Sequence, residues 1–159
     1  MQAPSLYGYF DSKNAIYDAM FAQGAQEFVD AEPWAEMTGD PRHDLGRILR
    51  YFVEFCAADV ARYQLLFQRT IPGFEPSPEA FAISQQSLAR FGERLARYGV
   101  SGPSAIDLFT ALGTGLATQQ TSNDPGGDRW IRLIDEAVEM FHAHMTRRTR
   151  SRTTKGRTR

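Results

Sequence analysis

The chain has 159 residues, of which 42% are hydrophobic and 23% are charged. This composition is typical of one globular domain with a hydrophobic core. Its single cysteine, Cys56, excludes an intrachain disulfide and therefore a disulfide-stapled secreted module. No apolar run approaches the roughly 18 residues of a transmembrane helix, and the first residues lack the basic and apolar regions of a signal peptide. We therefore expect a cytoplasmic protein that does not enter the membrane.

The net charge of -1 hides an uneven distribution of charge along the chain. The segment after Met145 contains basic residues and no acidic ones, so that all 19 acidic residues precede it. Because this segment has few apolar side chains to bury, we expect residues 146–159 to form a basic, disordered tail. The tail is either a solvated extension, which we favour, or an electrostatic contact to nucleic acid that reads no sequence.

The preceding part of the chain predicts an all-α fold. Period-two alternation of β-branched residues is absent, which argues against strands. Turns are indicated where Pro, Gly, Asn and Asp gather, most clearly in the proline-rich loop over residues 71–78. Ser77 is predicted to cap the helix after this loop, with Pro78 as its first residue and Gly99 closing it. The expected helices cover residues 4–10, 13–31, 42–58, 62–68, 78–98, 103–121 and 128–145.

The last two long helices have a pattern that indicates close packing. Gly113 and Gly115 lie inside one of them, and each glycine weakens a helix by roughly 1 kcal/mol relative to alanine. Close approach of another helix is the simplest reason for both glycines. These two helices either pair with their copies in a symmetric dimer, which we expect, or pack within the chain's own core. The residues expected at the dimer interface are Leu112, Gly113, Leu116, Gln120, Trp130, Leu133, Ile134, Ala137 and Phe141.

The most specific motif lies near the start of the chain, where residues 6–16 read Leu-Tyr-Gly-Tyr-Phe-Asp-Ser-Lys-Asn-Ala-Ile. This string resembles the end of the helix-turn-helix in the TetR family of transcriptional repressors. In that family the recognition helix ends in Leu-Tyr-x-x-Phe and is followed by a short turn, Ser-Lys and an apolar position. The rest of the chain also resembles a TetR-type regulatory domain, because it is helical, has a Pro/Gly-rich loop before a long helix, and ends in a helix pair. The matching positions are Leu6, Tyr7, Phe10, Ser12, Lys13 and Ile16.

The resemblance implies contacts with operator DNA. A helix-turn-helix places its second helix in the major groove with its N-terminal residues near the base edges. Tyr7 and Tyr9 match positions that face the DNA backbone, and Lys13 begins the next helix, where a phosphate is favoured. The alternative for the two tyrosines is an aromatic pair that packs on the following helix. The residues that fall on the base-reading end are Gln2, Ala3, Pro4 and Ser5, and Gln2 matches the geometry for reading adenine.

The chain departs from the family before this motif. The family has two helices and a tight turn there, whereas this sequence begins just after the expected position of the turn. We therefore expect Met1 to be an internal methionine or the start of a truncated chain. Residues 1–31 are then a remnant of the DNA-binding head, and residues 32–145 form a ligand-binding and dimerisation domain.

The resemblance also implies a small-molecule pocket inside the helical domain. The middle helices offer aromatic and apolar side chains, with Gln85, Gln86, Thr110 and Thr114 as orienting polar groups. Their character favours a lipophilic or aromatic effector, although phenylalanines at helical spacing also occur simply as core. The predicted lining is Phe52, Phe55, Cys56, Phe67, Phe81, Gln85, Leu88, Phe91, Phe109 and Thr110.

An enzyme is the third class that we considered. Glu139 and His142 have the carboxylate–histidine spacing of di-iron bundles, but the sequence contains no second such pair. It also contains no P-loop and no dinucleotide-binding glycine motif. We therefore predict no catalytic residue, metal or cofactor. The predicted function is ligand-responsive transcriptional regulation as a homodimer, with repression as the expected mode. The alternative is a ligand-binding helical dimer that does not bind DNA by itself.

Overall fold

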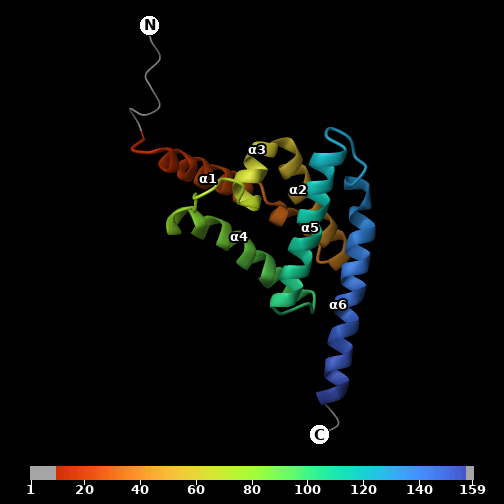
Figure 1. Ribbon diagram of the computed structural model, residues 1–159. Helices are drawn as coiled ribbons and strands as arrows, with labels where there is room; N and C mark the ends of the chain where they lie inside the picture. The colour runs from red at the N-terminus through yellow and green to blue at the C-terminus, as the bar shows by residue number, and fades with distance from the viewer. Residues whose placement is uncertain (1–9, 157–159) are drawn as a thin grey trace.

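We analysed a computed structural model of the chain, which describes residues 10–156, with side chains described through residue 148 (Figure 1). The described residues contain helices and no strand, which confirms the predicted all-α class for this part of the chain. The long helices are α1 (Lys13–Asp30), α2 (Pro41–Ala58), α4 (Pro78–Arg97), α5 (Pro103–Asn123) and α6 (Ile134–Gly156). The shorter elements are α3 (Val60–Tyr63), η2 (Pro33–Glu36), η3 (Gln64–Gln68) and η4 (Ile131–Leu133).

The helix ends follow the capping residues of the sequence. The Ser12 hydroxyl accepts a hydrogen bond from the Ala15 N–H at 3.1 Å, so α1 begins at Lys13. Ser77 caps α4 in the same way, as predicted, and Pro78 is the first residue of the helix. At the other end of α4, Gly99 adopts a φ of 72°, a left-handed conformation that glycine adopts without steric cost. These local signals therefore set the length of α1 and α4.

Two packing groups hold the helices together. Helix α2 packs against both α5 and α6, whereas α1 packs against α4 (Figure 1). The first group forms the main core, in which the side chains of Leu45, Leu49 and Val53 on α2 are almost completely buried. The second group is smaller and joins Phe21 and Ala25 of α1 to the start of α4. No helix among residues 10–156 is both long and apolar enough to cross a lipid bilayer.

The structure places most of the predicted dimer-interface residues inside the chain itself. Gly113 faces α2, where an added Cβ would lie 3.2 Å from both Leu49 and Phe52. The close approach that we expected at this glycine therefore comes from side chains of the same chain. Leu112, Trp130 and Leu133 keep partial exposure. Those buried, which follow the alternative of an intramolecular core, are Gly113, Leu116, Gln120, Ile134, Ala137 and Phe141.

Gln120 has a structural role at the end of α5. Its amide nitrogen donates to the Gly127 carbonyl at 3.1 Å, and its amide oxygen accepts from the Trp130 N–H at 3.0 Å. The buried amide therefore fixes the turn between α5 and η4, which explains why a polar side chain is retained in the core.

Two elements differ from the sequence prediction. The expected helix over residues 62–68 is divided into α3 and the single π-turn η3, which ends at Arg69 with a φ of 47°. The last helix does not stop near Met145 but continues through Gly156, which corrects the expectation of a disordered tail from residue 146 for this segment. Basic residues are favourable at a helix C-terminus, and arginine is a good helix former, so lack of apolar side chains does not end the helix here.

Candidate ligand-binding site

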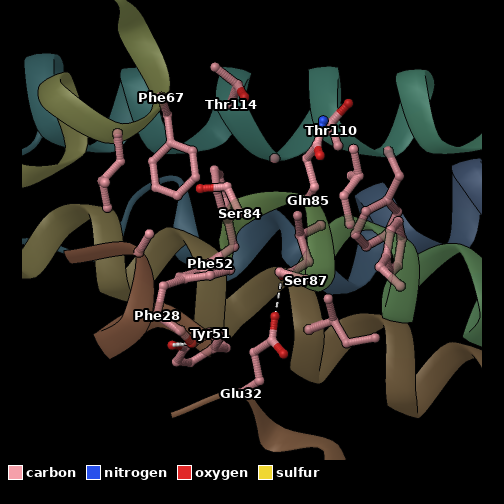
Figure 2. A pocket seen from close by; sticks show the side chains of 18 of the residues that line it. Phe28, Glu32, Tyr51, Phe52, Phe67, Ser84, Gln85, Ser87, Thr110 and Thr114 are labelled. Atoms are coloured by element: carbon pink, nitrogen blue, oxygen red, sulfur yellow. Dashed lines mark hydrogen bonds between the residues drawn. The ribbon is translucent and has the colours of Figure 1, made fainter. Parts of the chain in front are cut away.

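A cavity of about 340 Å³ lies between α1, α2, α4 and α5, with η2 and η3 contributing to its walls. Its walls are mainly aromatic. The Phe28 ring of α1 lies 5.7 Å from the Phe67 ring of η3, and Phe52 of α2 lies 5.1 Å from Phe67, measured between ring centroids. Phe91 and Phe109 stack at 4.7 Å farther along (Figure 2). Because rings from four different elements meet here without filling the space, the cavity is a property of the tertiary fold.

The cavity opens toward solvent along α4. Phe81 and Leu88 line it, yet they remain 42% and 45% exposed. Gln85, which lies between them on the same helix, is also exposed. Large apolar side chains at the edge of an apolar cavity are typical of the entrance to a small-molecule site.

Several polar side chains face the cavity from α4 and α5 (Figure 2). The Thr110 hydroxyl donates to the Ile106 carbonyl at 2.9 Å within its own helix. Ser84, Gln85 and Thr114, in contrast, make no side-chain hydrogen bond to another described residue. These three groups are therefore available to a bound molecule.

Glu32 is the charged group of the cavity. It lies between α1 and η2, and its side chain is only 3% exposed. Ser87 of α4 donates a hydrogen bond to one carboxylate oxygen, and the Trp34 indole N–H donates to the other (Figure 2). The Arg90 guanidinium lies 3.6 Å from that second oxygen, with half of its own side chain exposed. The carboxylate is thus held in place by groups from two parts of the chain.

Tyr51 completes this end of the cavity. Its hydroxyl donates to the Phe28 carbonyl at 2.6 Å. Burial raises the pKa of Tyr51 well above its ordinary value, and the negative charge of Glu32 raises it further. Tyr51 therefore stays neutral and presents its ring and a committed hydroxyl, leaving Glu32 as the charged group that a ligand would meet.

A second buried carboxylate, Asp44, lies outside the cavity. The Thr38 and Gly39 N–H groups each donate to it at 2.9 Å, and the Tyr98 hydroxyl donates from the end of α4. The Thr38 hydroxyl and His43 contact it as well. Burial raises the pKa of Asp44, but these hydrogen bonds outweigh it and hold the pKa well below its usual range. Burial and the bond to Asp44 raise the pKa of Tyr98 to about 12.

The cavity gathers most of the predicted ligand-binding residues. Phe55 and Cys56 are exceptions, which corrects the prediction for these two positions. Phe55 points to the other side, where the Arg62 guanidinium lies 3.9 Å from its ring centroid. Cys56 is completely buried in the main core, and burial raises the pKa of its thiol to about 12. Among the orienting polar residues, Thr114 lines the cavity and Gln86 does not. The predicted residues that do line it are Phe52, Phe67, Phe81, Gln85, Leu88, Phe91, Phe109 and Thr110.

Sequence reasoning missed the part of the cavity wall that precedes α2. It assigned α1 to the DNA-binding head, yet Phe21, Ala25 and Phe28 line the cavity. Their helical spacing was the available signal, since it marks one apolar face of α1. Glu32 and Trp34 had no comparable signal, because they lie in a non-periodic turn whose partners on α4 are distant in sequence.

The structure describes little of the predicted DNA contact. Gln2, Ala3, Pro4, Ser5, Tyr7 and Tyr9 lie outside the described residues. Lys13 is exposed at the first position of α1, with its Nζ 5.5 Å from the Tyr17 ring centroid. Within residues 10–148, no three His, Cys, Asp or Glu side chains are grouped as metal ligands. Glu139, which we considered with His142, forms an ion pair with Arg42 at 2.9 Å.

Comparison with known proteins does not add an assignment: the chain matches no family model, no curated protein and no solved structure.

Proposed function

We propose that the chain is the ligand-sensing part of a TetR-type transcriptional regulator that acts as a homodimer and responds to a small lipophilic or aromatic molecule. One observation carries this proposal. Helix α1 begins directly after the Leu-Tyr-Gly-Tyr-Phe string at its Ser-Lys end, and its other end forms a wall of the cavity. The segment that resembles a DNA-reading head and the candidate ligand site therefore share one rigid element.

This arrangement supplies a simple coupling mechanism. A ligand in the cavity contacts Phe21 and Phe28 and favours those positions of α1 that accommodate it. Any shift of α1 moves Lys13 and the residues before it. Ligand affinity and DNA affinity then depend on each other, with the same coupling free energy in both directions.

The proposal is tested by DNA binding. Operator sequences are selected from random or genomic fragments with this chain and with a version extended in frame upstream of Met1. We expect sequence-specific binding by the extended version and release of the DNA when a cavity ligand is added. Absence of specific binding by both versions would contradict the regulatory proposal.

A variant that fills the cavity separates sensing from DNA binding. We expect Ser84→Phe to occupy the space that Ser84 faces and to abolish ligand-induced release while DNA binding persists. Ala89→Phe is the matched control, because Ala89 lies on the exposed part of the same helix and does not line the cavity. Loss of the ligand response in both variants would instead indicate a general effect of α4.

One observation favours the alternative of a ligand-binding dimer that does not bind DNA on its own. Lys13 is the only basic residue before Arg42, although phosphate contacts normally depend on Lys and Arg. Equal failure of this chain on all DNA, together with operator binding by the extended version, would support that alternative for the chain as printed.

The homodimer is tested through the exposed apolar side chains of α5 and α6. Met140 on α6 is 60% exposed and Leu108 on α5 is 44% exposed. If these helices pair with their copies, Met140→Glu shifts the molar mass measured by light scattering from dimer to monomer. Met20→Glu on α1 is the control, because Met20 is 51% exposed but lies away from the helix pair (Figure 1).

A further inference from the structure

The charge of the cavity wall is unusual for an apolar site. Of the residues that line the cavity, Glu32 alone carries a formal charge. No lysine or arginine lines it, and the nearest cation identified by an ion pair, Arg90, is half exposed and already bound to Glu32. The interior therefore has negative polarity, which disfavours an anionic guest and favours a cationic one.

The Glu32 carboxylate has capacity for another partner. Each carboxylate oxygen accepts up to two hydrogen bonds or a close cation. The oxygen bound by Ser87 has that one donor among the described residues, whereas Trp34 and Arg90 share the other oxygen. The fixed partners orient the carboxylate without saturating it.

Aromatic faces surround this carboxylate. Trp34 is bonded to it, and Tyr51 lies close enough for the charge of Glu32 to raise its pKa. Phe28 packs on Tyr51 with ring centroids 5.1 Å apart (Figure 2). A cation next to these rings gains from their negative π faces in addition to the carboxylate.

We propose that the cavity binds a molecule with an aromatic, apolar body and a cationic nitrogen, and that Glu32 holds the cation. This inference rests on the proposed ligand-sensing function and names its ligand class. The phenylalanines around Phe67 and Phe109 accommodate the body, and the carboxylate with Trp34 and Tyr51 accommodates the head. A neutral molecule of the same shape keeps the first set of contacts and loses the second.

The test uses three probes of similar size that differ in charge. They are N-benzylpyridinium, a permanent cation; diphenylmethane, its neutral isostere; and the biphenyl carboxylate anion. Isothermal titration calorimetry on the full chain gives each dissociation constant. We expect the cation to bind about tenfold more tightly than the neutral probe, which is the size of a desolvated cation–π and ion-pair contribution, and the anion to bind most weakly.

Glu32→Gln is the decisive variant. It keeps an acceptor for Trp34 and Ser87 but removes the charge, so the cation loses about tenfold in affinity while the neutral probe is unchanged. Glu36→Gln is the matched control, because Glu36 lies four residues away, is 62% exposed and pairs with Arg47 outside the cavity. Circular dichroism and thermal unfolding show whether each variant is folded.

The outcomes separate this inference from the function on which it rests. Equal binding of cation and neutral probe, or an unchanged cation affinity in Glu32→Gln, overturns the cation inference and leaves a ligand-binding cavity in place. Tightest binding of the anion also overturns it. Binding of none of the three probes overturns the cation inference, and the DNA-release experiment then decides the proposed function separately.

Discussion

The two buried carboxylates of this protein show how similar burial can serve different ends. Asp44 receives two backbone N–H groups and two hydroxyls, and it faces no cavity. Glu32 is equally hidden from solvent but has fewer partners and borders an apolar space. A saturated carboxylate joins parts of the fold, whereas an unsaturated one beside a cavity retains capacity for a guest. The number of partners, and not the depth of burial, is therefore the informative quantity.

The largest expected difference comes from neutralising each carboxylate. Asp44→Asn turns one acceptor oxygen into a donor that meets the Gly39 N–H or the Tyr98 hydroxyl, and we expect a loss of about 3 kcal/mol in the free energy of unfolding. Glu32→Gln keeps its acceptors and should cost less than about 1 kcal/mol. Urea unfolding measures both, with the exposed Asp107→Asn as control. Equal losses in the two variants would break the comparison.

Tyr98→Phe tests one partner of Asp44 without removing the charge. We expect a loss of about 2 kcal/mol, because a hydrogen bond to a buried charged group disappears. The pKa of Asp44 should also rise, since the Tyr98 bond lowers it. Urea unfolding gives the first quantity and a pH series the second. An unchanged stability would mean that Tyr98 does not hold this carboxylate.

The pH dependence of stability is the third test. The pKa of Asp44 is lowered in the folded chain, so its contribution is complete above its unfolded pKa of about 3.9 and is lost as the pH falls below that value. We expect the wild-type advantage over Asp44→Asn to shrink by about 1 kcal/mol between pH 5 and pH 3, as measured by urea unfolding. A constant difference across this range would contradict the assigned hydrogen bonds.

The smallest expected effect concerns a glycine outside both carboxylate regions. An added Cβ at Gly115 meets nothing within 4 Å in the described part of the chain. Gly115→Ala should therefore stabilise α5 by roughly 0.5–1 kcal/mol. Thermal unfolding measures this gain, and Gly113→Ala is the control, because its Cβ would press on Leu49 and Phe52. Destabilisation by Gly115→Ala would indicate that a partner chain approaches there.

The sequence predicted what depends on local pattern. The apolar spacing, Ser77, Pro78 and Gly99 predicted the position of the long helices, and the phenylalanines of α2, α4 and α5 predicted most of the aromatic wall. The two carboxylate sites were not predictable in this way. Glu32 meets Ser87 across 55 residues and Asp44 meets Tyr98 across 54, so their environments arise only when α4 packs against the rest.

The correction at Phe55 and Cys56 has the same origin. Helical spacing identifies which residues of α2 are apolar, but two neighbouring directions around the helix are both covered in the folded chain. Phe52 faces the cavity, Phe55 faces Arg62, and Cys56 faces the main core. Only the positions of α1 and α5 decide which of these directions leads to the open space.

Cys56 makes the main core observable in solution. It is the only thiol in the chain, it is completely buried, and burial raises its pKa to about 12. A thiol reagent therefore has to wait until the chain opens, and its reaction rate reports how often that happens. A molecule bound in the adjacent cavity should lengthen this waiting time in proportion to its occupancy. The protein thus carries its own internal timer for ligand binding, with no added label.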